Sequence, residues 1–462
     1  MPVRLSPCAA ALLLLTLSFP PTGAQAQAAT PPAFPKTADT SYTAALYILD
    51  GQVVKARSTP AAVSGGDADG GNATGITVKS DTTDLNGVFV RGSDYTVADS
   101  HITLSGNGSD DFVGLGAGAM IDGGGTLVLR KVDITTDGLI RPATMAADHG
   151  VLKVYDSTLR ANGGILPPDY KPRIGPGMAE PPAGLHIGGT ARAALTVGNG
   201  QSYFYRSTII ANGWGALSTD AADAKVYVEA DHSIIQVQGP GYGVYADSRC
   251  QVVLNHTSIT AQTFDAIMAG VSTLAWTDVT ARSEGNGVMV HNVMGTPAEV
   301  ATLSIKDGTL ETGGDAILVR SANLALDLEG ATVKPWNGVL LRSVISDDPF
   351  ATKVNGQAAP GIVARFAHMI VTGDVLHQDK DRPMVLELQD TVLKGRILAA
   401  RVKLGAGARW TATADSTVTL LDAIAVDGID APSGITITAA AGPGTTLKGI
   451  YKLASGGMLK VD

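Results

Sequence analysis

Short runs in which apolar and polar residues alternate recur along most of the chain. Val151–Tyr155, Lys225–Ala230 and Gln251–Leu254 each place an aliphatic or small residue at every second position, and a polar pair follows. Alternation with a period of two over a few residues is typical of half-buried β-strands. The pattern therefore predicts many short strands with no helix between them.

A second pattern, a small residue followed by an aliphatic strand, interleaves with the first. It recurs at Gly215, Gly243, Ala266, Gly287, Ala316 and Gly338. The five steps cover 338 − 215 = 123 residues, or about 25 residues a step. An antiparallel meander gives no reason for this order to recur in register. A coil with one repeat per turn does, because equivalent strands then stack in parallel about 4.8 Å apart.

We therefore expect an all-β fold, a single-stranded right-handed parallel β-helix solenoid of roughly 13–15 turns. The coil should occupy residues 46–400, and residues 401–462 should form a C-terminal module that closes it. Tyr42–Val54 is expected to cap the other end, since an open turn exposes unpaired backbone. Three insertions interrupt the repeat, at residues 163–183, 291–299 and 343–361. Insertions in a solenoid protrude on a face, where they build a binding site or merely decorate the surface.

The N-terminal 28 residues have the features of a secretory signal peptide. Arg4 supplies the basic end, residues 9–17 the apolar run, and Ala24, Ala26 and Ala28 the small cleavage positions. The apolar run is too short to cross a bilayer, and no later run approaches the necessary length. Residues 29–45, with several prolines, are predicted to be a leader. We expect an exported protein that is periplasmic, associated with the outer surface or extracellular, with no membrane span.

The composition of the chain limits which classes of binding partner are expected. Lys and Arg total 34 against 43 Asp and Glu, a net charge of −9, and no basic cluster occurs, which argues against nucleic acid. Cys250 is the only cysteine outside the signal segment, so no internal disulfide is expected. His-x-x-x-His and cysteine spacings typical of metal sites are absent. We therefore expect no cofactor and no metal, and a monomer.

The last part of the chain resembles a known group. The segment 401–420, RVKLGAGARWTATADSTVTL, places a Trp-containing strand before a DSTV strand. It is similar to the C-terminal module of pertactin-like, autotransporter-passenger-type right-handed β-helix proteins, where that module assists folding during export. Those proteins continue into an outer-membrane β-barrel, whereas this sequence ends at Asp462 without a translocator barrel. We expect that another system exports it.

Alternation sorts the side chains that follow each small residue. The first and third positions should face the interior, and the second and fourth should face outward. The second position is largely apolar: His186, Leu217, Tyr245, Met268, Met289, Leu318 and Leu340. The fourth changes from Asp to His to Arg: Gly188, Thr219, Asp247, Gly270, His291, Arg320 and Arg342. An apolar groove beside Asp, His and Arg would suit a sugar ring with acidic substituents.

We call the outward side chains at the second position the apolar file and those at the fourth position the charged file. These files and the residues near them supply the candidate site residues. Asp247, His291, Arg320, Arg342 and Asp220 are the catalytic candidates, and His186, Arg192, Trp214, Tyr245, Met268 and Met289 are the candidates for ligand binding. In a lyase, His291 or Arg320 would abstract a proton and Arg342 would neutralise a uronate carboxylate. The alternative is that the apolar file packs under the insertions and the charged file only solubilises the rim. Tyr203, Tyr205 and Trp336 are further aromatic candidates, for which a packing role is the alternative.

Three functions are compatible with this pattern. The first is an adhesin-like, secreted bacterial β-helix that binds glycan or another cell-surface partner. The second is a polysaccharide-active enzyme, a lyase or glycoside hydrolase, working in the outward groove between the insertions. The third is a structural envelope protein.

Overall fold

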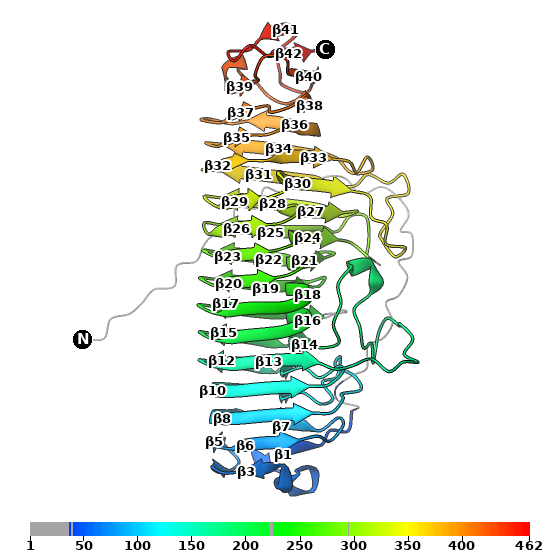
Figure 1. The fold of residues 1–462 in the computed structure, drawn as a ribbon, viewed down its shortest axis with the longest axis vertical. Helices are drawn as coiled ribbons and strands as arrows, with labels where there is room; N and C mark the ends of the chain where they lie inside the picture. The colour runs from blue at the N-terminus through cyan, green and yellow to red at the C-terminus, as the bar shows by residue number, and fades with distance from the viewer. Residues whose placement is uncertain (1–36, 38–39, 221–224, 294) are drawn as a thin grey trace, which may run out of the picture.

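The structure is a computed structural model that describes residue 37 and residues 40–220, 225–293 and 295–462. It is an elongated coil of short strands, and the chain climbs from one end to the other (Figure 1). The predicted signal peptide at 1–28 lies outside the described residues, as does most of the 29–45 leader. The first strand begins at Ala44, just inside the predicted leader. No helix among the described residues has the length and apolarity that a membrane crossing requires.

Three parallel sheets run along the coil. The first contains β8(Tyr95–Ser105), β10(Thr126–Asp137), β12(Val151–Tyr155), β15(Gln201–Tyr205), β17(Val226–Asp231), β19(Cys250–Asn255), β22(Thr273–Thr277), β25(Val300–Lys306), β28(Asn323–Glu329), β31(Ile362–Ala367), β34(Met384–Gln389), β36(Ile397–Leu404), β38(Ser416–Leu420), β40(Thr436–Ala441) and β42(Met458–Val461). These fifteen strands pair in parallel, each with the next. The predicted parallel β-helix is therefore confirmed, and its coil is right-handed (Figure 1).

The second sheet contains the later parts of β8 and β10 and the first parts of two long strands, β16(Thr208–Asp220) and β18(Ile234–Ala246). Its other members are β6(Thr77–Ser80), β13(Thr158–Gly163), β20(Ser258–Ala261), β23(Thr280–Ser283), β26(Thr309–Thr312) and β29(Thr332–Pro335). A separate four-stranded sheet follows, made of β32(Ile370–Thr372), β35(Val392–Lys394), β37(Arg409–Thr411) and β39(Ile429–Asp430).

The third sheet takes the last parts of β16 and β18. Its other members are β1(Ala44–Leu49), β7(Asn86–Arg91), β9(Ala119–Asp122), β11(Thr144–Ala146), β14(Arg192–Val197), β21(Phe264–Ala269), β24(Asn286–His291), β27(Ile317–Arg320), β30(Val339–Val344) and β33(Asp374–His377). The first part of β36 continues it. Because β36 spans residues 397–404, the predicted boundary at 400/401 falls inside a strand and the coil runs on through it.

Antiparallel pairs close both ends of the coil. At the N-terminal end β1 pairs with β2(Gln52–Val53), β3(Val63–Ser64) pairs with β6, and β4(Asp67–Ala68) pairs with β5(Asn72–Thr74). At the C-terminal end β41(Gly449–Lys452) pairs with β42. From residue 40 on, the described part of the chain also contains the 3-10 turns η2(Lys55–Arg57), η3(Pro60–Ala62), η4(Ala183–Leu185) and η5(Val426–Gly428). The antiparallel strand pairs use backbone groups that an open turn would leave unpaired.

Stacked side chains of similar kind fill the interior. Val154, Phe204 and Ala230 occupy equivalent positions on β12, β15 and β17, and all three are buried. At the corner between the first two sheets, the buried hydroxyls of Ser207 and Ser233 each accept a hydrogen bond from the backbone N–H of the preceding turn. Such bonds satisfy corner N–H groups that face away from water. Packing and these ladders, rather than a disulfide, hold the coil, and Cys250 is a buried free thiol.

Candidate functional site

The outward face of the third sheet is covered by the first insertion. Phe112, Trp214, Tyr242, Phe264, Ile267 and Met289 form one buried apolar cluster with Met178 and Leu185. Met178 lies in the 163–183 insertion and Leu185 lies in η4, directly after it. Trp214 and Met289 are almost completely buried. The predicted open hydrophobic groove is therefore absent here, and the packing alternative describes this face.

The register of β21 differs by one residue from the predicted one. Val244 of β18 lies beside Ala266, and not beside Ile267 as the small-residue pattern indicated. Met268 consequently faces the interior core, and Ile267 faces outward into the covered cluster. The prediction that Met268 faces outward is wrong, because Ala266 is small enough to look like the marker residue but fills an inward position. Leu217 is also inward, because it lies beside Val244, so that Ala216 and not Gly215 is equivalent to Gly243.

The file of charged residues is confirmed for part of its length. Ala269, His291 and Arg320 lie side by side on β21, β24 and β27, so Ala269 takes the place predicted for Gly270. Arg342 is not in this file: it lies beside Leu318, two residues before Arg320. It makes a two-point ion pair with Asp315, with Nε 2.6 Å from Oδ2. The structure therefore does not bring Arg342 beside His291 and Arg320.

Arg192 is a buried structural cation. Its Nε donates to Oδ2 of Asp111 at 2.9 Å, and its guanidinium lies over the rings of Phe112 and Trp214. Both members of the ion pair are almost fully buried. Burial raises the pKa of Asp111, and the neighbouring guanidinium opposes that effect. Arg192 thus anchors the covered face and, as placed, offers no surface to a ligand.

Asp220 lies at the edge of the same group. Its Oδ2 is 3.9 Å from Nη1 of Arg192, and its side chain remains 19% exposed. Burial and the nearby carboxylate of Asp247 raise the pKa of Asp220 well above its usual range. Asp247 itself is held by its backbone N–H, which donates to the Thr219 hydroxyl. A carboxyl whose pKa is raised, next to a second carboxyl on the neighbouring turn, is an arrangement that acid–base chemistry uses.

Arg320 joins two insertions to the sheet. Its Nη1 donates to the carbonyl of Gly184 at 2.9 Å, and its Nη2 pairs with Asp347 of the 343–361 insertion. His186 Nε2 lies 3.8 Å from the same carboxylate. Both insertions protrude on one side of the coil (Figure 1). Where the two insertions were predicted to wall an open cleft, the segment at 184–186, directly after the first insertion, is thus tied to the 343–361 insertion across the covered face.

His291 lies beneath these insertions. Its Nε2 is 3.4 Å from the hydroxyl of Tyr245, and the side chain is almost fully buried. Burial, with the positive charge of Arg320, lowers the pKa of His291 to about 4. Burial also raises the pKa of Tyr245 well above its usual range. At neutral pH this histidine and this tyrosine are therefore both uncharged.

An exposed indole marks a different surface, on the second sheet. Trp336 follows β29 and is 75% exposed, the most exposed aromatic side chain among the described large apolar residues. It borders a shallow depression lined by Arg282, Ser283, Glu284, Glu311, Thr312 and Gly313. Gly313 lets this corner pack closely on the preceding turn, because a Cβ there would lie 1.9 Å from the carbonyl oxygen of Glu284. The sequence marked Trp336 as a candidate, but not the charged residues around it.

Tyrosines gather on the outward face of the first sheet. The rings of Tyr155 and Tyr205, on neighbouring turns, stack with centroids 5.1 Å apart. The ring centroids of Tyr203 and Tyr227 lie 5.5 Å apart. Glu229 accepts a hydrogen bond from the hydroxyl of Tyr227 at 2.7 Å, and burial with this carboxylate raises the pKa of Tyr205 to about 12. All four rings are half-buried and held by their neighbours.

One group of side chains has the chemistry to hold a metal ion. Asp231, His232 and His256 lie together at the corner after β17 and β19, and no second such group occurs in the part of the chain that the structure describes. Sequence reasoning missed it, because it looked for short metal-binding spacings. The available signal was the repeat itself: the histidines are 256 − 232 = 24 residues apart, which is one turn of the coil.

No protein-family model matches the chain, and no curated protein matches it.

Proposed function

We propose that the protein is an exported, adhesin-like β-helix that binds glycans. The observation that carries the proposal is the exposed ring of Trp336 beside its charged depression. A large aromatic ring left in water loses the favourable free energy of burial, so an exposed tryptophan beside a hollow favours a binding role. Trp combines an apolar face with an N–H donor, which suits a ligand that is apolar on one side and polar at its edges.

The groups around Trp336 match the needs of a sugar ring. The indole would cover the C–H face of a pyranose, and Arg282 and Glu284 would hydrogen-bond its hydroxyls. Charged hydrogen-bonding groups are roughly twice as strong as neutral ones. Glu311 is already oriented by Lys334, whose Nζ lies 3.1 Å from its Oε1. A preorganised carboxylate lowers the entropy that binding costs.

The tyrosine face offers a second contact area for a long glycan. Because its rings stack along the coil, they present edges and hydroxyls, rather than faces, to solvent. Tyrosine hydroxyls held by Gln201 and Glu229 would hydrogen-bond sugar hydroxyls without a large loss of side-chain freedom. Two contact areas on one rigid coil would raise the affinity for a polymer above that for one sugar.

Immobilised neutral and acidic polysaccharides test the proposal. The wild-type protein should bind at least one of them, and Trp336→Ala should bind it roughly tenfold or more weakly, since such an anchor contributes about 2 kcal/mol. Trp336→Phe should retain part of the affinity. Ile450→Ala is the matched control, because Ile450 is 67% exposed on β41 and lies away from the depression. No binding by the wild type, or equal binding by wild type and Trp336→Ala, would overturn the proposal.

A second candidate function rests on Asp220 and Asp247. A carboxyl whose pKa is raised, next to another carboxyl, supports the role of general acid in a glycoside hydrolase or lyase. Incubation with the same polysaccharides, followed by measurement of new reducing ends or unsaturated products, distinguishes an enzyme from a binding protein. Product formation that Asp220→Asn abolishes and Asp133→Asn leaves unchanged would favour the enzyme. Neither binding nor product would favour the structural envelope protein.

A further inference from the structure

A file of left-handed residues runs along the corner between the first and second sheets. Asp156, Arg206, His232, His256 and Asp278 have φ values of 50°, 48°, 48°, 46° and 51°. Left-handed corners of this kind are unusual for residues other than Gly, Asn and Asp. Because each turn adds one such residue about 4.8 Å from the last, side chains at this corner become neighbours although they are a full repeat apart in sequence.

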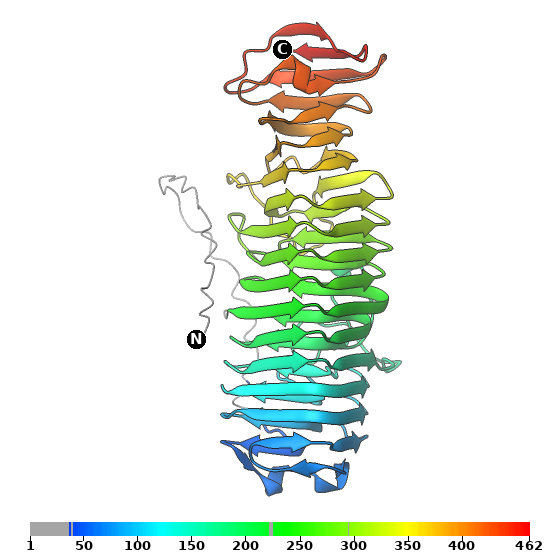
Figure 2. The same ribbon diagram turned by 90° about the vertical axis from the view of Figure 1, so that its left-hand side faces the viewer.

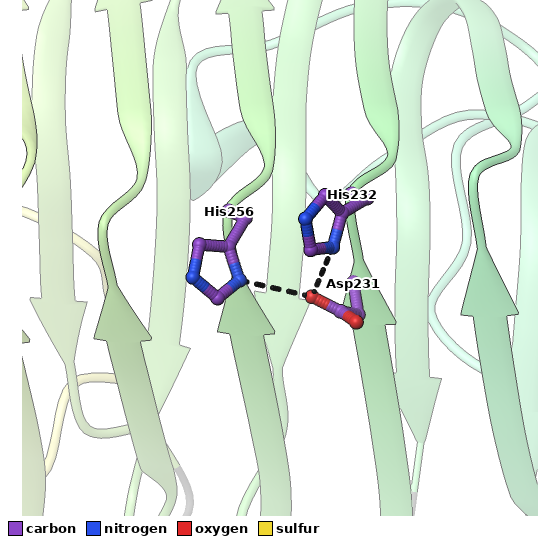
Figure 3. A group of neighbouring side chains, drawn as sticks. All are labelled: Asp231, His232 and His256. Atoms are coloured by element: carbon purple, nitrogen blue, oxygen red, sulfur yellow. Dashed lines mark hydrogen bonds and ion pairs between the residues drawn. The ribbon is translucent and has the colours of Figure 1, made fainter.

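Two histidines and a carboxylate meet in this file (Figure 3). Nδ1 of His232 is 2.9 Å from Oδ1 of Asp231, and Nδ1 of His256 is 3.2 Å from the same oxygen. The imidazole rings are stacked, with centroids 4.6 Å apart and planes inclined by 27°. The side chains are 60%, 48% and 31% exposed for His232, His256 and Asp231. An ion can therefore reach them directly from solvent.

We propose that Asp231, His232 and His256 form a binding site for a divalent transition-metal ion of the zinc class. Imidazole nitrogen and carboxylate oxygen are the ligands such ions prefer, with bonds of about 2.0–2.1 Å. Two ligand atoms on a tetrahedral ion with these bonds lie about 3.3 Å apart. The Oδ1–Nδ1 separations of 2.9 and 3.2 Å are already close to that value. The ion takes the place of the protons that the imidazoles share with the carboxylate, and water completes its coordination.

The neighbouring corners lack the same set of ligands. One turn earlier, Arg206 forms an ion pair with Asp156, with Nε 2.7 Å from Oδ1, and a guanidinium cannot ligate a metal. Further along, His368 Nδ1 lies 3.1 Å from Asp390, which is one histidine and one carboxylate only. The pair of histidines on consecutive turns thus distinguishes the proposed site. The pair of His368 and Asp390, with a single histidine, provides a control within the same protein.

Calorimetric titration of the untagged protein with zinc chloride tests the proposal and needs no glycan. We expect one zinc ion per chain, and an affinity that falls by roughly tenfold or more in His232→Asn and in His256→Asn, by analogy with the 10–100-fold cost of even outer-shell changes. Asparagine tolerates the left-handed conformation, so these variants should keep the corner. His368→Asn is the matched control and should bind zinc as the wild type does.

Each other outcome counts against the site. No zinc binding by the wild type would overturn it, as would undiminished binding by the double variant His232→Asn/His256→Asn. An equal loss in His368→Asn would show that zinc binds exposed histidines without selectivity, which also overturns it. A circular dichroism spectrum that is the same for all variants excludes unfolding as the cause. The zinc titration involves no glycan. A negative result would therefore overturn the metal site alone, and failure to bind glycans would overturn the proposed function alone.

Discussion

Arg192 shows how a single residue can have the right chemistry for one role and the environment for another. Its charge and its place near the outward files suggested a contact to an acidic ligand. The fold gives it a buried carboxylate partner, Asp111, which comes from a loop 81 residues earlier in the chain. A buried cation needs such a partner, because an unpaired buried charge costs several kcal/mol. Alternation within one strand carries no information about a partner that distant.

His291 should make the stability of the protein depend on pH. The pKa of this buried histidine in the folded protein is about 4, below the value of about 6.5 in an unfolded chain. Between these values the unfolded chain binds more protons than the folded one, so stability falls as the pH decreases from about 6.5 to about 4. We expect His291→Gln to lose this component, which is on the order of 3 kcal/mol.

Urea unfolding of wild type and His291→Gln at several pH values between 4 and 7 measures the difference. Comparison of the two proteins cancels the opposite contributions of buried carboxyls such as Asp265, whose pKa is raised by burial. The stability of the wild type relative to the variant should therefore decrease toward pH 4. A constant difference across this range would contradict the buried, neutral state of His291.

At the scale of strands, the sequence predicts the repeat better than the register. The period of about 25 residues and the alternation within each strand were enough to predict a parallel coil and the inward or outward direction of most residues. They failed at β16, β21 and β30, where Gly215, Ala266 and Gly338 are not equivalent to Gly243. The register is shifted by one residue at β16 and β21 and by two residues at β30. A shift of one residue reverses the direction of every side chain in a strand. Small residues occur both as corner markers and as interior fillers, so their spacing alone cannot fix the register.

Gly215 is a position where the stacking of strands demands glycine. It lies beside Tyr242 on the next turn, and a Cβ there would be 1.9 Å from the Tyr242 ring. We expect Gly215→Ala to destabilise the protein by about 1–3 kcal/mol, because the ring is packed in the covered cluster and cannot move away freely. Thermal unfolding measures this change.

Two comparisons make the Gly215 result specific. Gly71→Ala should have little effect, since a Cβ at Gly71 would meet only the Asp69 side chain, at 3.6 Å. In the background of Tyr242→Leu, which removes the clashing ring atoms, Gly215→Ala should cost less than it does in the wild type. Equal costs in both backgrounds would show that the contact with the ring is not the cause.

At the scale of the molecule, the insertions decide which face can meet a ligand. Strands repeat, so their arrangement follows from the sequence. Insertions do not repeat, so their packing over the apolar file was predicted only as one of two alternatives. They cover the third sheet, where most of the predicted site residues lie, and Arg320 ties them together. The exposed Trp336 lies beside the second sheet and the half-buried tyrosines lie on the first, on strands that Figure 2 shows as a regular stack. Because the third sheet is buried, we expect the ligand to bind on another side of the coil, at the surface beside Trp336.

Hydrogen–deuterium exchange with a bound oligosaccharide tests this account most directly. The oligosaccharide is taken from the polysaccharide that binds best, and the exchange of backbone amides is compared with and without it. We expect slower exchange at residues 282–284, 311–313 and 334–337, around the depression beside Trp336, and no change at residues 183–190. Slower exchange confined to residues 183–190 and 345–350 would place the ligand on the covered face and contradict the account.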